Sequence, residues 1–294
     1  MSNKLDLHMH SNISNDGEYS PSELMELCYK SGLKTVSLAD HNSIRGIREA
    51  KEAAEKLGLE FITGIELDCQ FEGSNLHLLG YGIDPTVPDF EINEKDVLNK
   101  EQVASSKRIE LVKDLGIYFE MEKVMKLAIE GVVTGEMIAE VALEDKRNEN
   151  NILLEPYRKG GKRSDNPYVN FYWDLCSQGK PAYVSVNFIS LSEAINLIKK
   201  AGGIAVLAHP GANIKQDKNK LEGIIGCGID GIEVYSSYHD EDTIEFYSNQ
   251  VEKFNLIKTI GSDFHGKTKP SIKYGSMKCE EETEIYNKFM KKLS

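Results

Sequence analysis

The stretch Lys4-Leu5-Asp6-Leu7-His8-Met9-His10 stands near the start of the chain and joins a short apolar segment to two histidines. Residues 4–7 predict a first strand, so His8 and His10 come where that strand ends. Side chains two residues apart on an extended strand point to the same face. The two imidazoles are therefore expected to face the same space, and a single metal ion could take both.

Outward from this stretch, short apolar segments alternate with helical patterns. Ser20-Pro21-Ser22-Glu23 has the capping box of a helix start, and Gly32 is typical of a helix end. The same rhythm predicts helices at 43–57, 192–201, 218–226 and 240–254, and strands at 35–39, 61–65, 204–208, 231–235 and 256–261. This alternation is typical of an α/β barrel or of a mainly parallel sheet.

The pattern changes between the two halves of the chain. Residues 67–83 place Glu72-Gly73-Ser74-Asn75 between two alternating runs, which predicts a β-hairpin. From about 94 to 145 the pattern is helical and highly charged, and 148–166 is polar and predicts a loop. We predict that residues 94–180 form an inserted, mainly helical cap, and that residues 1–93 and 181–294 form one catalytic barrel.

Composition narrows the class of protein. The 294 residues carry 47 acidic and 35 basic side chains, a formal net charge of -12, so no global field attracts a polyanion. The five cysteines are widely spaced without a C-x-x-C pair, which indicates a reducing cytoplasm. No apolar run approaches the roughly 20 residues that span a bilayer. The composition therefore predicts a cytoplasmic protein without a membrane partner, and it leaves the oligomeric state open.

Most of the predicted strands end in a residue that can bind metal. The candidates are His8, His10, Asp16, His41, Glu66, His77, His209, Asp263 and His265. Imidazoles mixed with carboxylates suit divalent Mn, Fe or Zn better than the oxygen cages of Ca. The carboxyl ends of barrel strands meet at one face, where active sites lie, so these side chains are expected to converge.

Each candidate also has an ordinary explanation. Asp16 lies in an Asn-Asp-Gly turn, Asp40 could cap a helix, and Glu66 could lie on the surface. His77 could be a hydrogen-bonded core histidine, and His209 could end its strand next to a proline. Independent structural histidines would have little reason to gather at several strand ends. The set as a whole therefore predicts a multinuclear metal site and a hydrolase.

The motifs together resemble the polymerase-and-histidinol-phosphatase (PHP) family. They are Leu7-His8-Met9-His10-Ser11, Ser14-Asn15-Asp16-Gly17, Ala39-Asp40-His41-Asn42, Gly64-Ile65-Glu66, His77, Ala208-His209-Pro210 and Gly261-Ser262-Asp263-Phe264-His265-Gly266. The resemblance implies a distorted (β/α)7 barrel with a trinuclear site. It implies one ion at His8, His10, Glu66 and Asp263, a second at Glu66, His77 and His209, and a third at Asp16, His41 and His265. Asp40 would then orient an imidazole.

The helical insert resembles most the subgroup that acts on nucleotide phosphomonoesters, including 3',5'-bisphosphorylated nucleotides, and on the 5' ends of RNA. That subgroup often carries Gly-Arg-Pro-His-Ile-Ala in the insert, where this chain has Thr134-Gly135-Glu136-Met137-Ile138-Ala139. The basic substrate contact that the resemblance implies is absent. Arg108 and Arg163 are the candidate replacements, although both could be ordinary solvated charges.

The resemblance implies hydrolysis of a phosphomonoester by metal-bound hydroxide, without a protein nucleophile. His239 has no predicted metal and is a candidate proton donor or phosphate ligand, or else a surface residue at a helix start. Three other functions stay open. They are a histidinol-phosphate phosphatase, a non-catalytic metal-bound regulatory module, and a 5'-3' exonuclease on short single-stranded nucleic acid. Tyr168, Phe171, Tyr172 and Trp173 could stack bases for the exonuclease, although a core helix explains them more simply.

Overall fold

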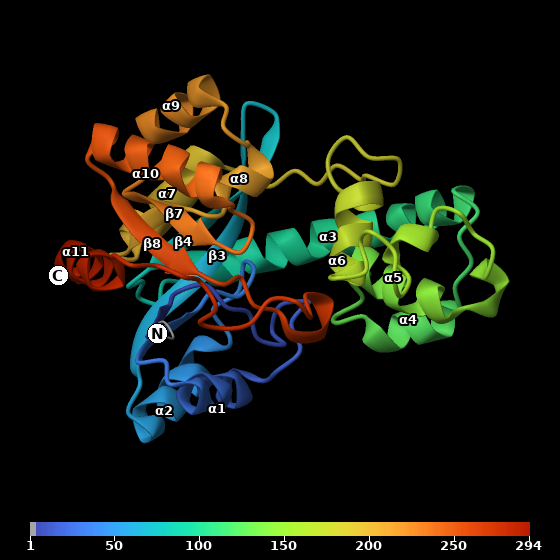
Figure 1. Ribbon diagram of the computed structural model, residues 1–294, viewed down its shortest axis with the longest axis horizontal. Coiled ribbons are helices and arrows are strands. Elements are labelled where there is room, and N and C mark those ends of the chain that lie inside the picture. The colour runs from blue at the N-terminus through green and yellow to red at the C-terminus, as the bar shows by residue number, and fades with distance from the viewer. Residues whose placement is uncertain (1–3) are drawn as a thin grey trace.

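The computed structural model describes residues 4–294, and seven of its strands form a barrel-like sheet (Figure 1). In their order around the sheet they are β1 (Leu5–Asp6), β2 (Thr35–Leu38), β3 (Glu60–Phe71), β4 (Ser74–Tyr81), β6 (Ile204–Leu207), β7 (Gly231–Ser236) and β8 (Ile257–Gly261). The short β5 (Ile189–Ser190) pairs with β3 outside this path. The N–H of Leu7 donates to the carbonyl of Ile260 at 3.0 Å, which joins the first strand to the last. The expected distorted barrel is confirmed.

The expected hairpin accounts for the distortion. β3 and β4 pair antiparallel through the turn at Glu72 and Gly73, and β4 is also antiparallel to β6, whereas the other neighbours on the path are parallel. A single reversed strand needs only a tight turn instead of a crossover helix. β4 therefore runs opposite to both of its neighbours, β3 and β6.

Helices surround the sheet, and the sequence pattern predicts all of them except α8 and α11. They are α1 (Pro21–Ser31), α2 (Ile47–Leu57), α7 (Leu191–Lys200), α8 (Pro210–Asn213), α9 (Lys218–Gly226), α10 (Glu241–Phe254) and α11 (Glu282–Leu293). Ser20 and Glu23 form the predicted capping box of α1, and Gly32 ends this helix at a left-handed φ of 90°. Helix α2 begins at Ile47, four residues later than expected at 43. The sequence pattern did not anticipate α11, whose buried Phe289 packs edge-to-face on Tyr81 at 5.3 Å between ring centroids.

A second body, formed by the middle of the chain, extends to the right of the barrel in Figure 1. It contains α3 (Asp89–Asp114), α4 (Met121–Leu127), α5 (Gly135–Glu144), α6 (Pro167–Phe171) and a π-helical turn (Tyr172–Cys176). A short 3-10 turn, Lys146–Asn148, leads into the predicted loop at 148–166, and a second one, Glu155–Tyr157, lies within it.

Helix α3 joins the two bodies. Phe90, near its start, belongs to the barrel core, and Val112, near its end, belongs to a separate apolar core of the insertion. The predicted boundary at residues 93 and 94 therefore falls inside one continuous helix. The helices within residues 4–294 do not include one that is both long and apolar enough to cross a membrane.

Candidate metal centre

Six of the seven histidines gather at one end of the barrel. His8 and His10 follow β1, His41 follows β2, His77 lies on β4, His209 follows β6, and His265 follows β8. The carboxyl ends of parallel strands meet at one edge of a sheet, and this geometry collects residues that lie far apart in the sequence. The predicted ligands Asp16, Glu66 and Asp263 lie among these histidines.

Glu66 lies at the middle of the group and has both carboxylate oxygens against imidazoles. Its Oε2 lies 3.2 Å from the Nε2 of His8 and 3.2 Å from the Nε2 of His10. Its Oε1 lies 3.0 Å from the Nδ1 of His77 and 3.0 Å from the Nε2 of His209. One fully buried carboxylate therefore faces two sets of nitrogen donors on opposite sides.

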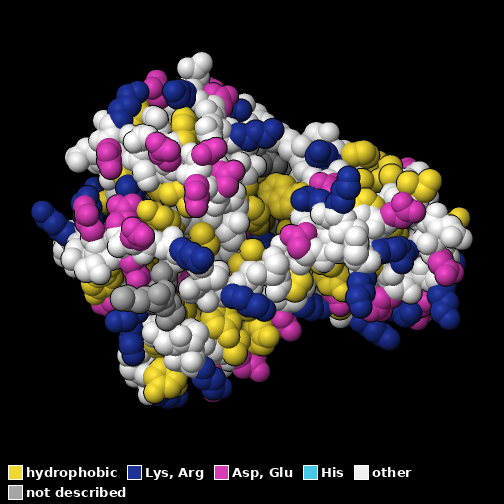
Figure 2. Space-filling view, viewed as in Figure 1, with side chains coloured by type: hydrophobic (Ala, Val, Ile, Leu, Met, Phe, Trp, Pro, Cys, Tyr) yellow, Lys and Arg dark blue, Asp and Glu magenta, His cyan; other side chains and the backbone are white. Residues whose placement is uncertain are grey.

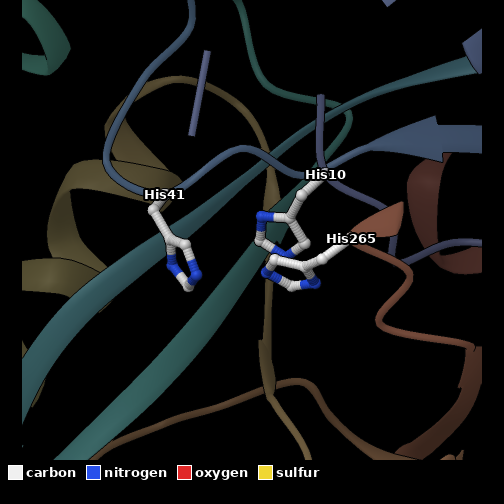
Figure 3. Close-up of side chains that lie close together, drawn as sticks. All are labelled: His10, His41 and His265. Atoms are coloured by element: carbon white, nitrogen blue, oxygen red, sulfur yellow. The ribbon is translucent and has the colours of Figure 1, made fainter. Parts of the chain in front are cut away.

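The other predicted ligands complete the two ends of the group. Asp263 Oδ1 lies 3.4 Å from His8 Nε2 and 3.3 Å from His10 Nε2. Asp16 Oδ2 lies 3.2 Å from the Nε2 of His265. His10, His41 and His265 converge in Figure 3, with the rings of His10 and His265 stacked 4.0 Å apart.

Each set has the geometry of a metal site before any ion is considered. Donor atoms of His8, His10, Glu66 and Asp263 all lie within 4.8 Å of one another, and the same holds for His41, Glu66 and His77, and for His10, His41 and His265. The first set equals the set that the family resemblance implies for one ion. The second set has His41 where the resemblance implies His209. The third set has His10 where the resemblance implies Asp16, which reaches this end through His265.

Residues that the sequence analysis missed hold the outer nitrogens of these rings. Glu233 Oε1 lies 2.8 Å from the Nδ1 of His8, and Asp68 Oδ1 lies 3.1 Å from the Nε2 of His77. The side-chain oxygen of Asn213 lies 2.9 Å from the Nδ1 of His209. An acceptor at the outer nitrogen fixes a proton there, so the inner nitrogen keeps its lone pair for a metal.

Gly261 lets strand β8 lie close to both His8 and Glu233. A Cβ at this position would collide with the Cβ of His8 and with the Oε1 of Glu233, so only glycine lets β8 pass beside both. His209 and Asp263 add a second sign of a constrained site, because their φ angles are 24° and 56°. Non-glycine residues in this region are strained, and such strain often lies at functional sites.

Within residues 4–294, several buried atoms in the group make no hydrogen bond of ordinary geometry, although oppositely charged or polar atoms lie 3.2 Å from some of them. They are Asp16 Oδ1, His41 Nδ1, Glu66 Oε2 and His265 Nε2. An unpaired buried polar atom is costly in free energy, and four of them together on predicted ligands fit divalent cations. Burial, together with the neighbouring His265 and His41, lowers the pKa of His10 to about 3. His10 is therefore neutral at pH 7, which is the form that binds metal.

Asp40 lies behind the imidazoles, where the family resemblance implies that it orients one of them. Its Oδ1 accepts from the N–H and its Oδ2 from the hydroxyl of Ser11, at 2.8 and 2.7 Å. The hydroxyl of Ser14 also donates to Asp40, and the same Oγ lies 3.2 Å from the Nδ1 of His10. Asp40 therefore orients His10 through Ser14 and holds the loop after β1.

His239 is engaged by backbone on both ring nitrogens. Its Nε2 accepts from the N–H of Gly211 at 2.9 Å, so its Nδ1 carries the proton and donates to the carbonyl of Val234 at 2.9 Å. Burial lowers the pKa of His239 and keeps the ring neutral. Both ring nitrogens thus have backbone partners, which favours support of the loop after His209, and the role as proton donor or phosphate ligand stays a prediction.

We expect His239→Asn to lower stability more than turnover. The variant loses two backbone hydrogen bonds and part of a packed ring, which together are worth about 2 to 3 kcal/mol. Thermal unfolding and the rate of phosphate release are measured on the metal-loaded protein. We expect the turnover of the variant to fall by less than about tenfold. A far larger loss of turnover with unchanged unfolding would restore His239 to the reaction.

The two candidate arginines have partners other than the metal-binding group. Arg108 is buried and donates to the carbonyl of Val133 at 2.6 Å and to Glu101 at 3.0 Å. Arg163 makes a two-pronged ion pair with Asp174, at 3.0 and 3.1 Å. Lys269, which the sequence analysis did not single out, is the basic residue that reaches the group. Its Nζ lies 2.5 Å from the Oδ2 of Asp263.

Glu136 lies where the insertion meets the barrel. It lines a cavity of about 90 Å³ together with Asp16, Thr134, Glu140 and Lys267. Burial, and then the charge of Asp16, raise the pKa of Glu136 to about 7. At the position where the resemblance implies a basic contact, this chain thus has a buried acid next to Asp16.

We expect Glu136→Gln to stabilise the chelator-treated protein at alkaline pH. The folded-state pKa lies above the unfolded value, so the native state binds the proton more tightly and stability falls as pH rises through about 7. Glutamine removes this loss, which is on the order of 3 kcal/mol at pH 8 and small at pH 5. Urea unfolding at both pH values measures it. The prediction would be contradicted if the free energy of unfolding of the variant differed from that of wild type by the same amount at both pH values.

Comparisons with known proteins agree with this geometry. A model of the PHP domain matches residues 6–162. The chain belongs to the PHP family. This PHP protein is 31% identical over 268 residues to a 5'-3' exoribonuclease of Haemophilus influenzae, covering 90% of this chain and 91% of that protein. It is 28% identical over 269 residues to a 3',5'-nucleoside bisphosphate phosphatase of Chromobacterium violaceum, covering 89% of this chain and 87% of the relative.

A solved structure supports the fold. It is an amidohydrolase from Chromobacterium violaceum with bound sulfate, 24% identical, with a TM-score of 0.78 over 97% of this chain and 96% of that one. The expected family and barrel are thereby confirmed. The PHP protein is an enzyme, a phosphoesterase of the hydrolase class, as the sequence motifs predict.

Proposed function

We propose that this PHP protein hydrolyses a phosphomonoester of a nucleotide with the help of two or three divalent transition-metal ions, Mn, Fe or Zn. The observation that supports this most is the position of Glu66, whose two oxygens face nitrogen donors on opposite sides. A bridging carboxylate is the ligand that holds two ions close together. Two-metal sites of this kind are typical of phosphatases and nucleases.

The proposed ligands follow the distances. His8, His10, Glu66 and Asp263 would hold one ion, and Glu66, His77 and His209 would hold a second. Asp16, His41 and His265 would hold a third, with His10 near enough to share it. Bound ions would lower the pKa of water and hold the oxygens of the phosphate.

The protein's own residues prepare this site. Glu233, Asp68 and Asn213 fix the orientation of three imidazoles. Lys269 places a positive charge beside Asp263, although the molecule as a whole is acidic. With metal ions bound, the site would be locally positive and could take an anionic phosphate despite the net charge of -12.

A 5'-3' exoribonuclease is the second candidate, favoured by the Haemophilus influenzae relative. It would use the same ions on a longer substrate. The two candidates differ in what lies beyond the phosphate, because an exonuclease needs a groove for successive nucleotides.

Metal analysis coupled to phosphate release tests the proposal. The purified protein is loaded with Mn, Fe or Zn in turn and given nucleoside mono- and bisphosphates, histidinol phosphate and a short 5'-phosphorylated RNA. We expect two or three bound equivalents and release from nucleotides, abolished by a chelator. Release from histidinol phosphate alone, or shortening of the RNA without release from mononucleotides, would overturn the nucleotide phosphatase in favour of the other function. Bound metal without any hydrolysis would overturn both candidates.

A further inference from the structure

Trp173, the one tryptophan of the chain, lies outside the core of the insertion. Its neighbours in the sequence behave as an ordinary core helix, since Phe171 and Leu175 are buried in that core and Tyr172 packs against it. The aromatic residues of this stretch therefore have different roles. Phe171 and Tyr172 pack in the core of the insertion, whereas packing in that core does not explain Trp173.

The backbone gives the reason for this position. Helix α6 continues into a π-helical turn at Tyr172–Cys176, which widens the helix locally. Such turns shift side chains out of the regular helical phase and are frequent at functional sites. The indole Nε1 of Trp173 is buried and has no hydrogen-bond partner. An aromatic ring with an unsatisfied donor is left facing away from its own core.

Trp173 faces the barrel next to the metal-binding group. Its ring packs edge-to-face on Tyr238, at 6.2 Å between centroids and an angle of 76°. Tyr238 follows the carboxyl end of β7, and its ring centroid lies 5.3 Å from that of His209. Lys269 Nζ lies 5.2 Å from the same tyrosine ring. Figure 2 shows hydrophobic side chains in the hollow between the barrel and the insertion.

We propose that Trp173 and Tyr238 form an aromatic subsite that binds the nucleobase of the substrate. The proposal rests on the proposed function, which places a phosphate at the metal-binding group, and it adds what is recognised beyond that phosphate. The Tyr238 ring packs near both His209 and Trp173, so a base held here would lie beside the metal-binding group that takes the phosphate. The Trp173 and Tyr238 side chains are both partly exposed, so their rings would stack on the base.

Paired substrates test the subsite. Adenosine 5'-monophosphate and ribose 5-phosphate carry the same phosphate and sugar, and only the first has a base. We expect Trp173→Ala to lower kcat/KM for the nucleotide by about ten- to a hundredfold and to change the value for ribose 5-phosphate less than twofold. Trp173→Phe should recover most of the loss, because it keeps a stacking ring. Tyr118→Ala, an exposed aromatic of the insertion, is the matched control and should change neither value.

The single tryptophan gives a second measurement that needs no variant. We expect the indole fluorescence of the metal-loaded wild-type protein to change on addition of adenosine 5'-monophosphate and to stay constant with ribose 5-phosphate. Equal kinetic losses on both substrates, or no fluorescence change with the nucleotide, would overturn the subsite. A fluorescence change without phosphate release from either compound would support the subsite and reject the proposed function, so the two failures are distinguishable.

Discussion

Replacing Glu66 with glutamine should reduce phosphate release by about a thousandfold or more and should remove at least one bound metal equivalent. The reason is that Glu66 offers one oxygen to each side of the group, 3.0 Å from His77 and His209 and 3.2 Å from His8 and His10. A glutamine keeps the shape of the side chain. It replaces one anionic oxygen with an N–H2 group, which cannot bind a cation.

Metal content per protein and the rate of phosphate release are measured together for this variant. Glu72→Gln is the matched control, because Glu72 lies in the exposed turn after the same strand. It should keep wild-type metal content and rate. If Glu66→Gln retained full metal content and a rate within tenfold of wild type, a bridging role for Glu66 would be excluded.

Replacing Glu233 with glutamine should weaken metal binding and activity by up to about a hundredfold. Glu233 is fully buried, and its two oxygens serve two ligands. Its Oε1 holds the Nδ1 of His8 at 2.8 Å, and its Oε2 accepts the backbone N–H of His209 at 2.8 Å. Glutamine can accept only one of these hydrogen bonds, and its N–H2 group faces the other donor.

The effect of Glu233→Gln should appear in the affinity for metal before it appears in kcat. Saturating the variant with Mn should therefore recover most of the rate, which would not happen for a residue that touches the substrate. The free energy of unfolding of the metal-free variant should be about 1 to 3 kcal/mol lower than that of the metal-free wild type, because a buried donor is left unpaired. Glu245→Gln on the exposed face of α10 is the control. Wild-type metal affinity in Glu233→Gln would show that His8 needs no such support.

The helical cap shows which features of the fold the sequence pattern did not predict. Charged helical segments predicted its existence, and the structure has helices there, but α3 runs from the barrel core at Phe90 to the insertion core at Val112. The predicted domain boundary falls at residue 94 because the sequence pattern changes there. In the structure one helix crosses this position and contributes side chains to the cores on both sides. In the same way α11 escaped prediction, because its packing on Tyr81 depends on the far end of the barrel.

The sequence by itself determined the α/β class and the candidate metal ligands, and its resemblance to the PHP family implied the barrel. Short apolar strands that end in histidines or carboxylates can be recognised from the sequence alone, because both the strands and the residues that follow them are local features. Closure of the barrel then had to bring those ends together, because parallel strands meet at one face. The spacing of His8 and His10 alone predicts a shared face, and the structure places both within 3.2 Å of Glu66.

Only the tertiary structure decided which residues support this group. Glu233, Asp68 and Asn213 stand at the outer nitrogens of His8, His77 and His209, and Lys269 stands beside Asp263. Each comes from another strand or loop, without a local motif to mark it. The structure also turned His239 toward backbone and Trp173 toward the barrel. The physical reason is that a side chain's role depends on its neighbours in space, and long-range packing sets those neighbours.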